Sequence, residues 1–280
     1  MIDLFRKNKS HSSRKVRILN ENTSFDAQEA FKAARTNLMF ILGQKKENNG
    51  NIVLFTSANQ AEGKTTTCVN LALTVSQAGH RVLLIDADMR KPRVNQSFGI
   101  DVAPGLSDKL SGMNDQSCVY EISCGNLFVL PAGTVPPNPA ELLASETMAE
   151  LLRSASEEFD YVFIDSPPVG IVTDAAVLCS KIAGAVIVTR YNMTTVDEVK
   201  NVYEQLESTG GKVLGLMMNN IDLKKASHYG HYGRYGHYGR YGHYARYGHY
   251  GRYGYGYGYG YGYGDKKGGG RDGDSDGGSD

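Results

Sequence analysis

The segment from Asn51 to Thr67 reads NIVLFTSANQAEGKTTT. It begins with an apolar run at 52–55 that is typical of a buried strand, and it continues through a loop of small and polar residues. Gly63-Lys64-Thr65 follows, where a helix is expected to begin. A phosphate-binding loop requires this order of strand, loop and helix, so the segment predicts an α/β fold with a site for a phosphorylated ligand.

The residue types of this loop fit phosphate chemistry. Loop amides and the positive end of a helix attract anionic phosphates. Lys64 is expected to reach the β and γ phosphates, and the Thr65 hydroxyl is expected to complete the shell of a Mg²⁺ ion. Ala58 replaces the usual first glycine, and because alanine does not readily adopt positive φ, we expect a wide loop. The predicted nucleotide-contacting residues of the loop are Ser57, Ala58, Asn59, Gln60, Ala61, Glu62, Gly63, Lys64, Thr65 and Thr66.

Composition limits the class of protein. The 280 residues carry a formal charge of zero, which implies no general attraction to nucleic acid. The cysteines form no C-x-x-C pair, which favours buried thiols in a reducing cytoplasm over disulfides or a metal site. They are Cys68, Cys118, Cys124 and Cys179. No apolar stretch approaches the ~20 residues of a membrane span, so we expect a soluble intracellular protein.

Four regions differ in composition. Residues 1–22 are polar and basic and predict a mobile arm; a solvated arm is favoured over attraction to anionic lipids. Residues 23–225 alternate helical and strand patterns and predict one domain. Residues 226–264 hold a tyrosine cluster, and residues 265–280 form a polar Gly/Asp tail.

The alternating region predicts a P-loop NTPase fold. Ser24 or Asp26 is expected to cap a first helix with Phe31, Leu38 and Ile41 on its apolar face. Continuous apolar runs indicate strands that are buried on both faces, hence a mainly parallel sheet with helices on each side. These strands are expected at 52–55, 82–85, 127–130, 161–164, 185–189 and 213–218.

Acidic residues follow two of these strands. Asp86 and Asp88 come after the run 82–85, and Asp165 comes after the run 161–164. Open α/β sheets place ligands at the carboxyl ends of their strands, so we expect the three carboxylates beside the phosphate loop. We predict Asp165 and Asp88 as magnesium ligands together with Thr65, and Asp86 as the group that deprotonates an incoming hydroxyl.

The tyrosine cluster contains 14 of the 18 tyrosines. Glycine beside nearly every tyrosine and the absence of aliphatic residues that could build a core predict disorder. A sticky low-complexity segment and loose metal binding by its five histidines are alternatives, but attachment to a phosphate-transfer domain favours phosphate acceptors. The candidate acceptors are Tyr229, Tyr232, Tyr235, Tyr238, Tyr241, Tyr244, Tyr247, Tyr250, Tyr253, Tyr255, Tyr257, Tyr259, Tyr261 and Tyr263.

The loop, the segments 85–92 and 163–168 and the tyrosine cluster together resemble the bacterial protein-tyrosine kinases of capsule and exopolysaccharide systems, over about residues 23–264. The stretch 133–145 is also similar to this family. The resemblance implies ATP and Mg²⁺ as cofactors and phosphorylation of the tyrosine cluster in trans. It implies subunit contacts through Glu29, Lys32 and Arg35, which match E-x-x-R-x-x-R except at Lys32, and thus a homo-oligomer, possibly a ring. Asn219 matches a position that contacts adenine in related folds.

The same resemblance implies partners. It places the chain in the cytoplasm as a catalytic subunit that a separate membrane protein of the chain-length-regulator type activates and recruits to the inner face of the membrane. A cognate tyrosine phosphatase and phosphorylated enzyme substrates complete the implied set, without nucleic acid. Three alternatives remain. A partitioning or septum-positioning ATPase would carry Lys where this chain has Asn59, an iron–sulfur carrier usually has a C-x-x-C pair, and a structural low-complexity protein would not need Lys64 or Asp165.

Overall fold

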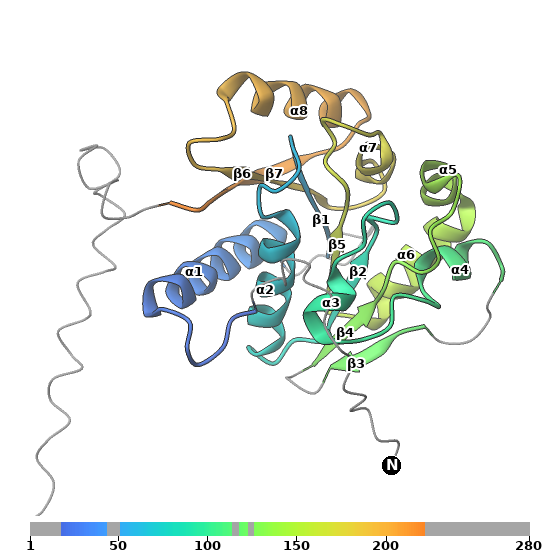
Figure 1. Ribbon diagram of the computed structural model, residues 1–280, viewed down its shortest axis with the longest axis horizontal. Coiled ribbons are helices and arrows are strands. Elements are labelled where there is room, and N and C mark those ends of the chain that lie inside the picture. Colours follow the sequence, from blue (N-terminus) through green and yellow to red (C-terminus); the bar gives the residue numbers. More distant parts are fainter. Residues whose placement is uncertain (1–17, 44–50, 114–117, 123–125, 222–280) are drawn as a thin grey trace, which may run out of the picture. The chain divides into compact units, whose positions relative to one another are not determined.

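A seven-stranded sheet forms the centre of the structure, a computed structural model that describes residues 18–43, 51–113, 118–122 and 126–221 (Figure 1). The strand order is β3-β4-β2-β5-β1-β6-β7, and every pair is parallel except β3 with β4. The strands are β1 (Ile52–Ser57), β2 (Val82–Asp86), β3 (Tyr120–Ile122), β4 (Leu127–Leu130), β5 (Tyr161–Asp165), β6 (Gly184–Arg190) and β7 (Val213–Asn219). The predicted, mainly parallel α/β fold is therefore confirmed.

Helices cover both faces of this sheet, as the continuous apolar strands predict. One face packs against α1 (Phe25–Leu42), α2 (Lys64–Ser76) and α3 (Val94–Phe98). The other face packs against α4 (Leu106–Leu110), α6 (Glu146–Glu158), α7 (Asp174–Cys179) and α8 (Val196–Ser208), with α5 (Pro139–Ala144) beside α6 and α7. In Figure 1 the helices α1 and α2 lie on one side of the strands and α7 and α8 on the other.

Successive residues of the central strands point to opposite faces. Ile52 and Leu54 join the core under α7 and α8, whereas Val53 and Phe55 join the core under α1 and α2. Phe55 meets Phe163 of β5 edge to face, with ring centroids 5.4 Å apart. Burial on both sides makes β1 and β5 a rigid base for the loops that follow them.

The first helix differs in detail from its prediction. Ser24 occupies the N-cap position of α1, but its side chain makes no capping hydrogen bond. Leu38 and Leu42 are buried, whereas Ile41 is exposed, because residues four apart share a helix face and the apolar face of α1 runs through Leu38 and Leu42.

The strand and cysteine predictions can also be compared with the structure. The sequence reasoning proposed no strand at β3, which is a three-residue antiparallel edge strand too short for an alternating pattern. Cys68, Cys118 and Cys179 are buried free thiols, as predicted. Cys124, the basic arm, the tyrosine cluster and the polar tail lie outside the described residues, and the predicted region boundaries stay predictions.

Candidate active site

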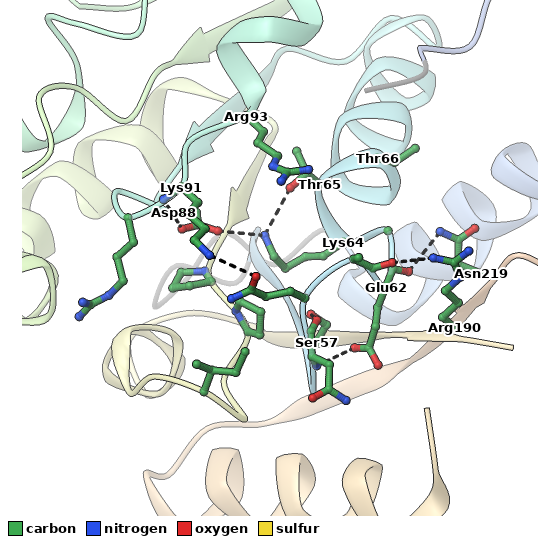
Figure 2. Close-up of a pocket in the computed structure, with 18 of the residues that line it drawn as sticks. Ser57, Glu62, Lys64, Thr65, Thr66, Asp88, Lys91, Arg93, Arg190 and Asn219 are labelled. Atoms are coloured by element: carbon green, nitrogen blue, oxygen red, sulfur yellow. Dashed lines mark hydrogen bonds and ion pairs between the residues drawn. The ribbon is translucent and has the colours of Figure 1, made fainter. Parts of the chain in front are cut away.

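Three motif segments meet at one edge of the sheet. Strands β2, β5 and β1 are adjacent, and Asp86 at the end of β2 lies opposite Asp165 at the end of β5. The phosphate loop follows β1 at the same edge and leads into α2. A cavity of about 710 Å³ opens there, a size that suits a nucleotide. Figure 2 shows side chains of the phosphate loop and of the segment after β2 around it, and Pro167 and Pro168 line it from the segment after β5.

The phosphate loop has two residues in the left-handed region of backbone conformation. Gly63 has φ +92°, and a Cβ atom at this position would lie 1.9 Å from the Nδ2 atom of Asn219. Ala61 has φ +65°, a conformation that alanine does not adopt readily. The left-handed conformation costs an alanine about 1–2 kcal/mol, which the surrounding contacts must offset.

Most predicted loop residues line the cavity. These are Ser57, Asn59, Gln60, Ala61, Glu62, Gly63, Lys64, Thr65 and Thr66, with Asn219 from the end of β7. Ala58 is buried and does not line it; the backbone of Gly170 packs on the Ala58 carbonyl, and a Cβ atom on Gly170 would come within 2.5 Å of that oxygen. Ala58 therefore supports the loop from behind.

Lys64 lies at the centre of a polar cluster. Its Nζ atom is 2.6 Å from Oδ1 of Asp165 and 4.0 Å from Oδ2 of Asp88. The Thr65 hydroxyl donates to Oδ2 of Asp165 at 2.7 Å. Burial opposes the charged form of Lys64, but Asp165 and Asp88 outweigh it and raise the pKa of this amine. Lys64 is therefore a fixed cation at the end of the loop.

The same cluster offers ligands that suit magnesium. Thr65, Asp88 and Asp165 present a hydroxyl and two carboxylates around the position of the Lys64 ammonium group, which is itself a cation held by these oxygens. Mg²⁺ takes few protein carboxylates and completes its shell with water and phosphate oxygens. Within the described residues no group of three or more His, Cys, Asp or Glu side chains could hold a metal ion. The predicted donor set thus fits magnesium accompanied by phosphates, and it does not fit a metal bound by protein alone.

Asp86 lies behind the cavity and does not line it. It is fully buried, and its carboxylate accepts hydrogen bonds from the backbone amides of Asp88, Arg93 and Val94 at 3.0–3.1 Å. Burial and the neighbouring charge of Asp165 raise its pKa to about 8. Through these bonds Asp86 fixes the backbone of the segment 88–94. Its role as a base stays a prediction.

Two contacts that the sequence reasoning did not predict hold the phosphate loop against β6 and α8. Glu62 is buried, accepts from the Asn59 amide at 2.9 Å and also accepts from the Thr194 hydroxyl. The Asn59 side chain donates to Glu198 at 2.7 Å. The Glu62–Thr194 and Asn59–Glu198 bonds join residues far apart in the chain, so only the folded sheet brings these partners together.

The far end of the cavity contains Asn219 and Arg190 (Figure 2). Asn219 donates to the Glu62 carbonyl oxygen at 3.3 Å, and Arg190 donates to the Ala61 carbonyl oxygen at 3.0 Å. The sequence reasoning singled out Asn219 but missed Arg190. The available signal was its position as the last residue of a strand that ends at the ligand edge.

An ion pair connects the segment after β2 with α7. Arg90 makes two bonds to Asp174, from Nε at 2.9 Å and from an η nitrogen at 3.1 Å. The Asp174 side chain is completely buried, whereas that of Arg90 is 44% exposed. Asp174 was absent from the predicted site, and a lone aspartate at a helix start carries no signal of such a partner in the sequence.

The predicted subunit-contact residues lie on α1. Lys32 pairs with Glu29 at 2.7 Å on the surface of the same helix. Arg35 is half-buried and donates to the Thr74 carbonyl oxygen of α2 at 3.1 Å. Their role between subunits stays a prediction. None of the helices that the structure describes has the length and apolar character needed to cross a membrane.

Comparisons with known proteins agree with this geometry. Residues 51–216 match the family model described as "AAA domain". Tyrosine-protein kinase CpsD of Streptococcus agalactiae is 39% identical over 74% of this chain and 90% of its own length. Tyrosine-protein kinase wzc of Salmonella typhi is also 39% identical over 74% of this chain, but the match spans only 28% of that protein.

Solved structures give the same picture. The kinase domain of the Escherichia coli tyrosine kinase ETK superposes with a TM-score of 0.68 at 32% identity, covering 76% of this chain and 83% of that domain. The cell division ATPase MinD of Pyrococcus furiosus is more distant, with a TM-score of 0.54 and 26% identity over 61% of this chain and 73% of its own. The fold is thus common to both classes, and the similarity is greater to the kinase domain.

Proposed function

Because this chain belongs to the bacterial tyrosine-protein kinase family, we propose that it transfers the γ-phosphoryl group of ATP to tyrosine hydroxyls of its own C-terminal cluster. The observation that carries the proposal is the Lys64 ammonium group, held by Asp165 and Asp88 beside the Thr65 hydroxyl at the end of a phosphate loop. Phosphoryl transfer depends mainly on positioning and on charge stabilisation, and this cluster offers both.

Different residues of the site are suited to different parts of the Mg-ATP ligand. The loop amides and the N-terminus of α2 are suited to the phosphates, and Lys64 is suited to the β and γ oxygens. Thr65, Asp88 and Asp165 would hold Mg²⁺, which neutralises phosphate charge when bound. Asn219 would contact adenine at the opposite end. Lys64 must leave part of its bond to Asp165 when phosphates enter, since one ammonium group cannot satisfy both partners fully.

The transfer itself needs a tyrosine oxygen to lose its proton. A free phenol has a pKa near ~10, so a base or strong polarisation is required at neutral pH. The new bond joins the tyrosine oxygen to the γ phosphorus, while the bond from that phosphorus to the bridging oxygen breaks and its electron pair leaves with ADP. Asp86 is the proposed acceptor of the proton. A carboxyl group whose pKa is near 8 keeps its proton at neutral pH, so this role requires Asp86 to ionise before the tyrosine hydroxyl reaches it; once ionised, it is a stronger base than an exposed carboxylate.

The proposed acceptors are the 14 tyrosines between Tyr229 and Tyr263. Residues 226–280 hold seven Lys or Arg and five Asp, a formal charge of +2. Each phosphate adds about −1.5 to −2, so full modification would add roughly −21 to −28. A cationic tail would approach the acidic cluster of Asp88 and Asp165, and a modified tail would be repelled from it. We propose that this change alters subunit association.

The wider role follows from the family. Capsular or extracellular polysaccharide synthesis is the proposed process, and transfer in trans within a homo-oligomer is the proposed arrangement, with Glu29, Lys32 and Arg35 at the contact. A membrane protein of the chain-length-regulator type would activate the chain and recruit it from the cytoplasm to the membrane. A tyrosine phosphatase and phosphorylated enzymes would be further partners.

The partitioning ATPase is the second candidate, and the likeness to MinD favours it at the level of the fold alone. That class carries a lysine just after the first loop position, where this chain has Asn59. Asparagine is neutral, so the loop supplies no cation beyond Lys64, and the Asn59 side chain instead donates a hydrogen bond to Glu198. This difference, with the tyrosine cluster, favours the kinase.

A mixing experiment tests transfer in trans. One protein carries Lys64→Met with its tail intact, and the other has a wild-type cavity but ends at residue 225. We expect neither alone to form phosphotyrosine with Mg-ATP, and the mixture to phosphorylate the tail of the Lys64→Met chain. If only the full-length wild-type chain is modified, at a rate independent of protein concentration, transfer occurs within one chain and the proposal of trans transfer is wrong.

A further inference from the structure

The segment that follows β2 places three cationic residues along the cavity, Arg90, Lys91 and Arg93. Lys91 donates from Nζ to the Gln60 side chain at 3.2 Å, and Arg93 lines the same cavity. Figure 2 shows the Arg93 side chain pointing toward Thr65. The Arg93 backbone is fixed, since its amide donates to Asp86 at 3.1 Å. The segment therefore holds the base of the arginine rigidly and directs its guanidinium group to the Thr65 side of the site.

Arg93 differs from Arg90 in its partners. Arg90 is committed to the buried Asp174 by two hydrogen bonds. The Arg93 side chain has no hydrogen bond or ion pair with any residue in the described ranges, although it borders a cavity that contains Asp88. A guanidinium group has five donors and stays charged at all physiological pH values. An uncompensated group of this kind beside a phosphate loop is available to an anionic ligand.

The location of Arg93 indicates which part of that ligand it meets. Thr65 marks the end of the cavity where the proposed metal and the terminal phosphate belong, whereas Asn219 and Arg190 lie on the other side (Figure 2). Arg93 lies with Thr65. Asn59 stands at the loop position that would carry a second cation in a partitioning ATPase. Its side chain donates a hydrogen bond to Glu198. The loop thus provides no second cation at the terminal phosphate, and among the described residues Arg93 is the cation without a protein partner on that side.

We propose that Arg93 contacts the γ-phosphate of ATP from within the same chain and is a catalytic residue of the transfer. This inference rests on the proposed kinase function. As the tyrosine oxygen bonds to the γ phosphorus and the bridging oxygen leaves with ADP, negative charge is spread over the non-bridging oxygens, and the guanidinium group neutralises it while keeping its own protons. This cation belongs to the segment that follows β2 in the same chain. No residue of a second subunit is therefore needed to supply a cation at the γ-phosphate.

The test compares Arg93→Ala and Arg93→Lys with wild type, and uses Arg153→Ala as a matched control. Arg153 is exposed on α6, pairs with Glu146 and does not line the cavity. Calorimetry with Mg²⁺ measures the affinity for ADP and for the non-hydrolysable ATP analogue AMP-PNP. A second measurement follows phosphotyrosine formation on the tail. Thermal unfolding without nucleotide reports on the fold.

For Arg93→Ala we expect AMP-PNP binding to weaken about tenfold, ADP binding to change by less than about twofold, and kcat to fall by about 10²–10³. Arg93→Lys should recover part of the AMP-PNP affinity but little of kcat, because an ammonium group lacks the planar fork. Unfolding temperatures should match wild type, since the side chain has no partner to lose. Arg153→Ala should match wild type throughout.

Two results would overturn the inference. Equal loss of ADP and AMP-PNP affinity would place Arg93 at the inner phosphates, and unchanged affinity with unchanged kcat would remove it from the site. A different result would overturn the kinase function itself: wild-type protein that binds neither nucleotide, or that hydrolyses ATP without ever forming phosphotyrosine. The wild-type measurements therefore separate the failure of the function from the failure of the arginine assignment.

Discussion

The Arg90–Asp174 pair allows a prediction with a worked magnitude. Asp174 is completely buried and Arg90 is 44% exposed, so the two single substitutions should differ. Arg90→Ala leaves a buried carboxylate without its partner, which costs 3–5 kcal/mol when the pair is fully buried. Water can reach this pair from the Arg90 side, so we expect Arg90→Ala to lose about 3 kcal/mol of unfolding free energy, the low end of that range.

The reverse substitution should cost less. Asp174→Asn leaves an arginine that can be solvated, and we expect about 1 kcal/mol for the weakened hydrogen bonds. In the double variant no buried charge remains. The double variant should therefore lose about 1.5 kcal/mol of unfolding free energy, instead of the sum of the two single losses, about 4 kcal/mol. The coupling energy is then about 2.5 kcal/mol, which exceeds the usual limit for independent sites.

The assay is urea unfolding of the nucleotide-free protein, with tail phosphorylation measured in parallel. In a domain of this size each kcal/mol corresponds to about 2–4 °C in the unfolding temperature, so Arg90→Ala should lose roughly 6–12 °C. Its kcat should fall as well, because Arg90 anchors the segment that presents Asp88. Additive losses, or an Arg90→Ala variant as stable as wild type, would refute the reasoning that Asp174 is buried as a charged partner.

Three further predictions concern the loop and the strand end. Ala61→Gly should stabilise the protein by about 0.5–1 kcal/mol in urea unfolding, because φ is +65° there; a loss of stability would show that the alanine is unstrained. Gly63→Ala should weaken ADP binding more than tenfold in calorimetry, because its Cβ would overlap the Asn219 side chain and φ is +92°; wild-type affinity would contradict the positions of both residues. Asp86 holds in the native state a proton that the unfolded state releases, since its pKa rises from 3.8 to about 8. The stability of the nucleotide-free protein should therefore decrease as pH rises from about 4 to about 8, and Asp86→Asn should remove this part of the pH dependence in urea midpoints; identical profiles would contradict it.

The sheet was largely predictable because its strands are continuous apolar runs with motif residues at their ends. Six of the strands were expected within a few residues of their observed bounds. The seventh, β3, has three residues and little burial, so no periodic pattern could reveal it. The apolar face of α1 was misplaced at Ile41, because a sequence window cannot decide between neighbouring faces until the sheet fixes the helix rotation.

The site residues that belong to short sequence motifs could be predicted. Those that reach the site only through the packing of distant segments could not. Lys64, Thr65 and Asp165 follow from motif spacing, and the structure brings them within hydrogen-bonding distance. Asp86 was expected beside the phosphate loop, but its bonds to the backbone amides of the segment 88–94 could not be predicted from the sequence. Arg190 belongs to a different strand, and only the strand order places it beside the loop.

The most direct measurement is a phosphorylation map of the intact chain after incubation with Mg-ATP and an activator fragment. Mass spectrometry locates phosphotyrosine, while released ADP and free phosphate are measured in the same reaction, with Lys64→Met as the control. We predict phosphate on tyrosines between Tyr229 and Tyr263, formed in step with ADP and absent from the Lys64→Met protein. Steady release of free phosphate with an unmodified tail would contradict the proposed transfer.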